Sequence, residues 1–109
     1  MNLRFNVWFE DDGEVVASRW RMELLSAVDA HGSITAGAAA MGVPYRVAWK
    51  KIREMEDRLG ESLIATQTGG SEGGGAHLTA AGRVWVDRMH VFCDRADRAL
   101  LDIAGDIFD

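Results

Sequence analysis

The sequence predicts a mainly α-helical domain with a few short strands, an α+β fold, and three observations support this prediction. Three segments with helical apolar spacing follow one another between residues 19 and 59, and each is ended by a glycine. A glycine-rich stretch at 69–76 separates two short segments of strand character. Beyond it, apolar residues recur every three or four positions from 79 to 107. Helix, helix, helix, strand, loop, strand and helix is the order of a winged helix-turn-helix.

Length and composition fit one folded domain over residues 1–109. The chain is 48% hydrophobic and 27% charged, which is typical of globular proteins. Its apolar runs are too short to span a membrane, and a single cysteine cannot build a disulfide framework. We therefore expect a cytoplasmic protein with no membrane partner and no cofactor.

The charge is distributed unevenly along the chain. The net charge is −5, whereas DNA-binding domains are usually basic. Residues 1–18 hold one basic and four acidic side chains, and residues 83–109 hold four basic and six acidic ones. Residues 46–58, in contrast, hold five basic and three acidic side chains. This locally basic centre leaves DNA binding open without establishing it.

The first third of the chain predicts a hairpin and a helix. Residues 3–9 alternate apolar and polar side chains, which predicts a half-buried strand. The sequence Asp-Asp-Gly at 11–13 indicates a hairpin turn, followed by a short return strand at 14–16. Ser18 is suited to cap a helix that begins at Arg19 and ends at Gly32.

A helix-turn-helix is predicted at about 34–59. Ser33 or Thr35 caps a short helix at roughly 34–41, and Gly42 ends it. Pro44 fits the first turn of the next helix, which Gly60 ends. One face of that helix is apolar and the other is charged. The apolar face holds Val47, Ala48, Ile52, Met55 and Leu59, and the charged face holds Arg46, Lys50, Arg53 and Asp57.

Small residues mark the contact between these two helices. Helices joined by a short turn cross closely only where their side chains are small. Gly42 supplies a positive φ in the turn, and Val43 follows as an apolar anchor beneath it. The small surface is expected to come from Ala38, Ala39, Ala40 and Ala48.

The start of the later helix carries side chains that suit duplex DNA. A recognition helix meets base edges in its first turns. Arg46 is able to pair bidentately with guanine, and Tyr45 suits a phosphate or a thymine methyl group. Lys50 and Arg53 suit phosphates. An αα-hairpin in a small helical core, with merely solvated charges, remains the alternative interpretation of the same pattern.

Three motifs resemble the N-terminal DNA-binding domain of the ModE-type molybdate-responsive regulators, which is related to the LysR-type helix-turn-helix. They are "GSIT" at 32–35, "MGVPYRVAW" at 41–49 and "TGGSEGGGAHLTAAG" at 68–82. The resemblance covers essentially the whole chain and implies a transcriptional regulator with a wing at about 62–78. The DNA-binding residues that it implies, together with the chemistry above, are Thr35, Pro44, Tyr45, Arg46, Trp49, Lys50, Arg53, Thr68, Gly69, Gly70, Ser71, Gly73 and Gly74. For Trp49, core packing is the favoured alternative.

Departures from the family pattern limit what the resemblance implies. Pro44 stands where the family often has serine, and Ser71-Glu72 stands where a lysine-glycine pair is common. The wing thereby gains an acid in place of a cation. These 109 residues hold no counterpart of the oxyanion-binding domains, so molybdate sensing does not transfer and no small-molecule effector site is expected in this chain.

Other chemistry receives little support from the sequence. The glycine-rich loop lacks the Gly-Lys-Ser/Thr ending of a nucleotide-binding loop. His90 and Cys93 lie three residues apart on the last predicted helix, but two ligands are too few for a closed zinc site. Three scattered histidines form no recognisable catalytic constellation. We expect no enzyme activity and no metal site.

The last predicted helix, at about 79–107, carries a long apolar seam. It either packs on its own domain or docks on the same helix of a second chain, and its length favours the second interpretation. In the resembling families the corresponding helix forms the dimer. The seam residues are Trp85, Met89, Phe92, Ala96, Leu100, Ile103 and Ile107.

Two functional hypotheses follow. The first is a homodimeric winged-helix regulator that binds a pseudo-palindromic site in double-stranded DNA, with its recognition helix in the major groove and its wing on the backbone. The second retains the fold as a protein-interaction module, an adaptor or antirepressor of a full-length regulator, without DNA binding of its own. The acidic termini and the acidic wing would suit this second, alternative hypothesis.

Overall fold

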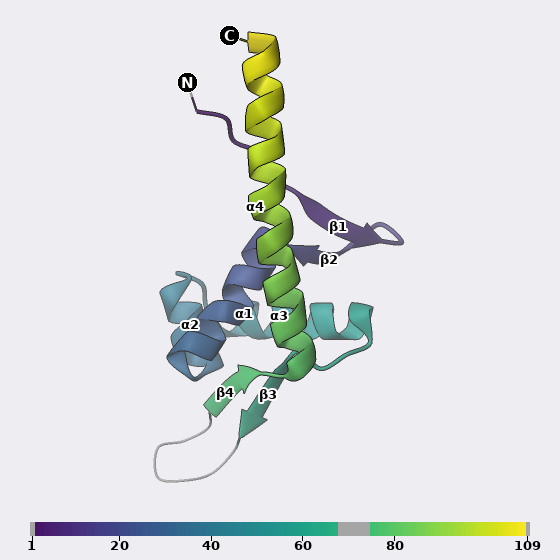
Figure 1. The fold of residues 1–109 in the computed structure, drawn as a ribbon. Coiled ribbons are helices and arrows are strands. Elements are labelled where there is room, and N and C mark those ends of the chain that lie inside the picture. Colours follow the sequence, from purple (N-terminus) through teal and green to yellow (C-terminus); the bar gives the residue numbers. More distant parts are fainter. Residues whose placement is uncertain (1, 68–74, 109) are drawn as a thin grey trace.

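The computed structural model describes residues 2–67 and 75–108, which form two β hairpins and four α helices (Figure 1). Their order along the chain is the predicted one. Both sheets are two-stranded and antiparallel, β1 with β2 and β3 with β4. The elements are β1 (Trp8–Asp11), β2 (Glu14–Ser18), α1 (Arg19–His31), α2 (Ile34–Ala40), α3 (Tyr45–Leu59), β3 (Ile64–Gln67), β4 (Gly75–Leu78) and α4 (Ala80–Phe108).

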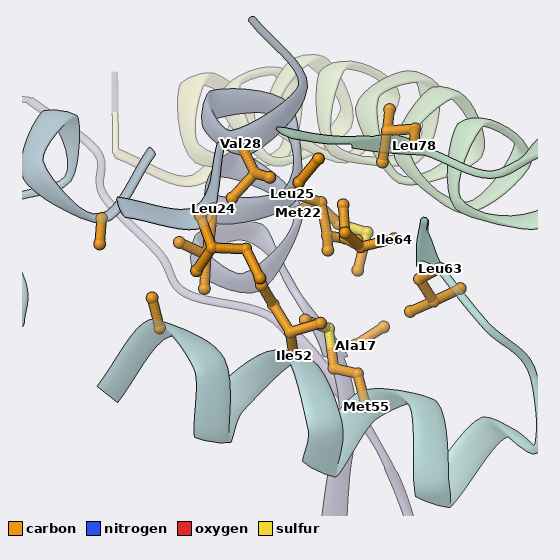
Figure 2. Close-up of a cluster of buried hydrophobic side chains, with 14 of the residues drawn as sticks. Ala17, Met22, Leu24, Leu25, Val28, Ile52, Met55, Leu63, Ile64 and Leu78 are labelled. Carbon is orange, nitrogen blue, oxygen red and sulfur yellow. The ribbon is translucent and has the colours of Figure 1, made fainter. Parts of the chain in front are cut away.

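Helix α1 is the centre of the core. It contacts α2, α3, α4 and β4, and its Leu24, Leu25 and Val28 are fully buried (Figure 2). Met55 of α3 and Leu63, just before β3, close the same cluster. Because each such side chain stabilises the fold by about 1.5–3 kcal/mol on burial, this cluster holds the other elements around α1.

The helices α1, α2 and α3 approach one another through small residues. A Cβ atom on Gly37 would lie 2.7 Å from the backbone of Val28, so α2 rests directly on α1. Ala38 and Ala48 are both buried between α2 and α3. The prediction was wrong for Ala39 and Ala40, which are exposed. The reason is that the inward face of this short helix is formed, at helical spacing, by positions 34, 37, 38 and 41, so positions 39 and 40 point to solvent.

The turn between α2 and α3 follows the predicted chemistry in most details. Ser33, rather than Thr35, caps α2, and its hydroxyl accepts a hydrogen bond from the Ala36 N–H at 3.0 Å. Gly42 has a φ of +70° as predicted. Pro44 differs from the prediction by one position. It is the residue before the helix, with an extended ψ of 149°, and not part of the first turn.

The N-terminal segment departs most from its prediction. The strand begins at Trp8 instead of residue 3, and all four β1 residues are exposed. The reason is that β2 ends at Ser18, opposite Trp8, so it offers residues 3–7 no partner, and the side of the hairpin that packs on the helices is formed mainly by Val16 and Ala17 of β2. The predicted turn is confirmed, with Asp12 and Gly13 at φ values of 52° and 79°. Phe9 packs on Phe92 of α4 with ring centroids 5.3 Å apart.

Helix α4 is 29 residues long and has two different halves. Its N-terminal half packs on the domain, where Gly82, Met89 and Cys93 are buried. Its C-terminal end projects beyond the rest of the molecule (Figure 1), whereas residues 2–5 line a hollow together with Asp97 and Leu101 earlier in the same half. Met89, predicted to lie at a dimer seam, is only 4% exposed and belongs to the core of its own chain. Within residues 2–67 and 75–108, none of the helices combines the length and the apolar character that crossing a bilayer requires.

We predict that Gly37→Ala lowers the free energy of unfolding by about 1–3 kcal/mol, because the added methyl group overpacks the contact with the Val28 backbone. Thermal denaturation measures the change. Ala39→Ser on the exposed side of the same helix is the matched control and should stay within about 0.5 kcal/mol. Equal stability of Gly37→Ala and the parent chain would contradict the close α1–α2 approach.

Candidate nucleic-acid interface

Helix α3 presents one exposed face of basic and aromatic side chains. Its inward side is formed by Ala48, Ile52 and Met55, which are almost fully buried. The predicted division into an apolar and a charged face is therefore confirmed. Every residue predicted on this helix to contact DNA lies on the exposed face, namely Tyr45, Arg46, Trp49, Lys50 and Arg53, and Pro44 and Thr35 nearby are exposed as well.

Trp49 points away from the core. It is 48% exposed, so the packing interpretation was wrong. Positions 48, 52 and 55 occupy the inward face of α3, which turns position 49 outward. The guanidinium carbon of Arg53 lies 5.8 Å from the centre of the indole ring. Arg53 also lies 3.8 Å from the Glu56 carboxylate, and these two contacts hold the exposed ring in place.

Two cations on this face have no ion-pair partner in the part of the chain that the structure describes. Within the described residues, neither Arg46 nor Lys50 forms an ion pair with a carboxylate, whereas Lys51, Arg53 and Arg58 all do. An unpaired, exposed cation keeps its full attraction for an external anion. Arg46 and Lys50 are therefore the side chains of α3 most available to phosphate or to a base edge.

A hollow of about 390 Å³ separates the start of α3 from the strands of the wing. Tyr45 and Trp49 form its aromatic part, and the rest consists of hydroxyl and amide side chains together with small or aliphatic residues. Thr66 and Gln67 of β3 belong to it, although neither was predicted as a site residue. Their position just before the glycine-rich loop could have identified them as site residues. The polar lining consists of Ser33, Thr35, Thr66 and Gln67.

Hydrogen bonds to carboxylates of α3 and α1 hold the base of the wing, strands β3 and β4, in place. The Glu56 carboxylate of α3 accepts hydrogen bonds from the backbone N–H groups of Leu63 at 2.8 Å and Ile64 at 3.2 Å. The Asp29 carboxylate of α1 accepts one from the Leu78 N–H at 2.9 Å. These bonds fix β3 and β4 relative to α3. The predicted wing residues Thr68, Gly69, Gly70, Ser71, Gly73 and Gly74 lie outside the described residues.

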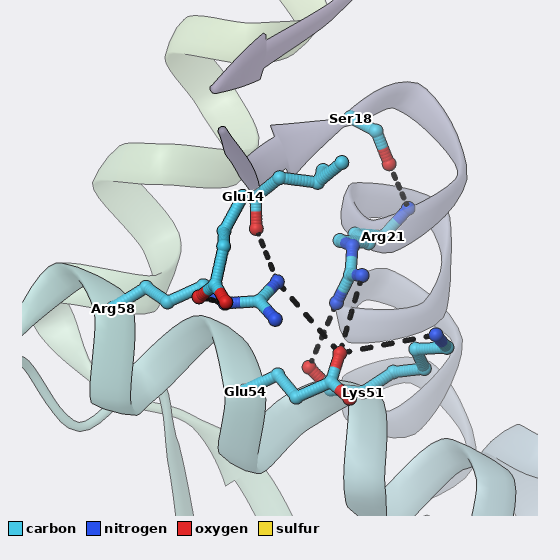
Figure 3. A network of polar contacts seen from close by, with 7 residues as sticks. Glu14, Ser18, Arg21, Lys51, Glu54 and Arg58 are labelled. Atoms are coloured by element: carbon cyan, nitrogen blue, oxygen red, sulfur yellow. Dashed lines mark hydrogen bonds and ion pairs between the residues drawn. The ribbon is translucent and has the colours of Figure 1, made fainter. Parts of the chain in front are cut away.

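A polar network ties α3 to α1 and β2 (Figure 3). The buried guanidinium of Arg21 donates to the Lys51 carbonyl at 3.2 Å and pairs with Glu54 at 3.3 Å. Arg58 donates to the Val15 carbonyl at 2.7 Å and pairs with Glu14 at 3.0 Å. Contacts on two sides restrict the rotation of α3 about its axis. This network could not be predicted from the sequence, because the charged residues that pair in it lie far apart along the chain.

The electrostatics of this network favour an ionised Glu54. Partial burial alone would raise the pKa of its carboxyl group. Lys51, Arg21 and Arg58 outweigh the effect of burial and hold the pKa below its ordinary value of 4.5. The pKa of Asp29 is lowered too, first by the hydrogen bond from the Leu78 N–H and then by Arg83.

The two side chains considered for metal or redox chemistry lie in different surroundings. Cys93 is buried, while His90 is largely exposed and lies 3.6 Å from Asp94 on the same helix. Over residues 2–67 and 75–108 there is no group of three or more side chains able to hold a metal ion together.

Comparison with known proteins gives one family. The model described as "Bacterial regulatory helix-turn-helix protein, lysR family" matches residues 20–83. Transcriptional regulator ModE of Yersinia pestis is 44% identical over 62 residues, which are 57% of this chain and 24% of that protein. Molybdenum-pterin-binding protein MopB of Rhodobacter capsulatus is 40% identical over 62 residues, 57% of this chain and 23% of that protein. The chain thus spans about a quarter of the length of these relatives.

Solved structures agree on the fold. The CbnR DNA-binding domain, in its DNA complex, superposes with a TM-score of 0.61 at 21% identity over 79% of this chain and 93% of that one. ArgP from Mycobacterium tuberculosis gives a TM-score of 0.57 at 20% identity over 77% of this chain and 30% of that one. The predicted winged helix-turn-helix is confirmed. A regulatory family also agrees with the prediction that the chain is not an enzyme.

We predict that Glu54→Gln lowers the free energy of unfolding at pH 7 by about 2 kcal/mol, because it leaves Arg21 with a weaker partner. The lowered pKa of Glu54 means that the unfolded chain binds this proton more tightly than the folded one. The stabilisation is therefore complete above the ordinary pKa and is lost as the pH falls through lower values. Glu54→Gln should flatten the loss of Tm between about pH 5 and pH 3.

Glu14→Gln is the matched control, since its carboxylate is mostly exposed and pairs only with Arg58. It should change stability by less than about 1 kcal/mol. An acid-induced decrease in Tm that is the same in Glu54→Gln as in the parent chain would show that Glu54 does not stabilise the fold in this way.

Proposed function

Because the chain belongs to the lysR family of bacterial regulatory helix-turn-helix proteins, we propose that it is a DNA-binding transcriptional regulator that acts as a homodimer. In this proposal α3 enters the major groove of double-stranded DNA and the β3–β4 wing follows the backbone. The observation that carries the proposal is the exposed face of α3, with Arg46 and Lys50 unpaired among the described residues. The description of similar proteins as transcriptional regulators supports it.

The dimensions and chemistry of α3 suit the major groove. A helix with its side chains is about 10–12 Å across, and the groove is about 12 Å wide. Arg46, in the first turn, is placed to donate two hydrogen bonds to guanine. Lys50 and Arg53 lie one and two turns further on, where the groove walls offer phosphates. Thr35 and Pro44 border this face and would contact the backbone.

The overall negative charge is compatible with this proposal. Asp102 and Asp106 belong to the C-terminal half of α4, and the end of this helix extends away from α3 (Figure 1). Exposed charges separated by more than about 8 Å are largely screened at physiological salt. The local basic face therefore determines the attraction for DNA more than the net charge does. A location in the cytoplasm, where bacterial DNA lies, follows from the same proposal.

The proposed dimer uses the C-terminal half of α4. Ile103 is 52% exposed and Ile107 is 67% exposed, with Leu101 and Phe108 also uncovered. Apolar side chains gathered along one helix are typical of an association surface. Phe92, Ala96 and Leu100 continue the seam toward the domain, whereas Trp85 donates its indole N–H to Glu61 and packs against the core of its own chain. Met89 does not belong to the proposed dimer interface, because its side chain is buried in the core of its own chain.

The charges along α4 favour an antiparallel pairing. Arg88, Arg95 and Asp102 are spaced by seven residues and lie on one side of the helix, and Asp106 follows one turn later. In an antiparallel copy centred between residues 98 and 99, Arg95 is opposite Asp102, Arg88 is within one turn of Asp106, and Phe92 is within one turn of Ile103. In a parallel copy this flank would face the other flank of the partner helix, so these arginines and aspartates would not meet. Antiparallel pairing is therefore the favourable arrangement.

We predict specific, salt-dependent binding to duplex fragments selected from a random pool. The logarithm of affinity should fall with the logarithm of salt concentration with a slope of about −0.9 per phosphate contact. Arg46→Ala should weaken specific binding by about 1–3 kcal/mol and relax one base-pair position. Lys50→Ala is the matched comparison and should weaken all sequences about equally. A pool that yields no preferred sequence would favour the adaptor hypothesis.

We predict that Arg95→Asp yields a monomer in light scattering, since each copy would then face Asp102 with a like charge. Adding Asp102→Arg should restore the dimer by reversing both charges. His90→Ala, on a different side of α4, should leave the dimer intact. A parent chain that is monomeric, or a single variant that dimerises as well as the parent, would contradict the antiparallel seam.

A further inference from the structure

Two aromatic side chains lie on the exposed face of α3, one helical turn apart. Tyr45 is 50% exposed and Trp49 is 48% exposed. Neither is needed to fill the core, because Ala48, Ile52 and Met55 already occupy the inward face. Large aromatic rings left in water at the centre of a basic face indicate a ligand that covers them with apolar surface.

The Trp49 ring is held in position before any ligand arrives. Arg53 lies over it at 5.8 Å, Glu56 pairs with Arg53 at 3.8 Å, and the other Glu56 oxygen is fixed by two backbone N–H groups at the start of the wing. Contacts that restrict a side chain in advance reduce the entropy lost on binding. The indole is thus a preformed apolar surface between polar and cationic neighbours.

The major groove offers one apolar group, the C5-methyl of thymine, beside hydrogen-bonding atoms on every base pair. The rise of about 1.5 Å per helical residue places Tyr45 and Trp49 about 6 Å apart along the axis of α3. Two base-pair steps span about 6.8 Å. A helix running along the groove would therefore bring the two rings to methyl groups about two base pairs apart.

We propose that Tyr45 and Trp49 select thymine at two positions of each half-site by packing on the C5-methyl groups, beside the guanine assigned to Arg46. This inference rests on the proposed function and specifies the base composition that the site prefers. Arg46 supplies hydrogen bonds to guanine, whereas the two rings discriminate by apolar contact. Thr35, Thr66 and Gln67 line the hollow beside the two rings, which are its only aromatic groups among the described residues.

The test replaces single thymines of the selected duplex with deoxyuridine, which removes only the methyl group. With the parent protein, affinity should fall about fourfold at each of two positions about two base pairs apart in the half-site, and stay unchanged at other thymines. Trp49→Ala should abolish the effect at one of these positions and leave the other. Tyr45→Phe, which retains the ring, should preserve both effects.

Lys50→Ala is the control, because it should weaken binding to the thymine and deoxyuridine duplexes by the same factor and leave their ratio unchanged. Equal affinity of the parent protein for thymine and deoxyuridine at every position would overturn the inference while leaving sequence-specific DNA binding intact. Failure to bind any duplex would instead overturn the proposed function, and this inference with it. Because the first comparison changes only the DNA, its outcome does not depend on how the variants fold.

Discussion

Close packing of three helices through small residues is the constraint on which the rest of the structure depends. Gly37 lets α2 rest on the backbone of α1, and Ala38 with Ala48 lets α3 cross α2 at short distance. Larger side chains at these points would separate the helices and rotate α3. Since Ile52 and Met55 are then committed to the core, the opposite side of α3 has to face outward. The basic and aromatic face is thus a consequence of how the core is filled.

Polar contacts in the C-terminal half of α3 refine this arrangement. Arg21 and Glu54 connect the middle of α3 with α1, and Glu56 connects the same helix with the start of β3. A burial pattern alone fixes which side of a helix faces the core, but it tolerates sliding and small rotations. Hydrogen bonds of defined direction reduce that freedom. The α3 face and the base of the wing therefore form one rigid surface, as readout of a base sequence requires.

Signals local in the sequence predicted most of the fold. Ser18 and Ser33 cap helices where expected, and Gly32, Gly42 and Gly60 have the positive φ angles of helix ends. The failures concern contacts between distant segments. Residues 3–7, expected to begin the first strand, find no partner in β2, because β2 ends opposite Trp8. Alternation of side chains cannot reveal where a partner strand ends, because that depends on another segment of the chain.

The candidate site shows the same contrast. The charged face of α3 was predicted in full, since helical periodicity alone assigns it. Trp49 was included among the DNA-binding residues with core packing as the favoured alternative, because an indole ring suits either place, and Met89 was assigned to a seam because it shares the spacing of the seam residues. Arg21 and Glu54 meet across 33 positions of sequence, and neither carries a local sign of its partner. Their pairing requires the three-dimensional arrangement of α1 and α3.

The most direct test of the central claim is an amide NMR titration of the protein with its selected DNA duplex. We expect the largest shifts on residues 45–53 of α3 and on residues 66–67 and 75–77 at the base of the wing. The far end of α4, residues 100–108, should shift little. Large shifts at the end of α4 together with unchanged signals from Tyr45, Arg46 and Trp49 would contradict the account.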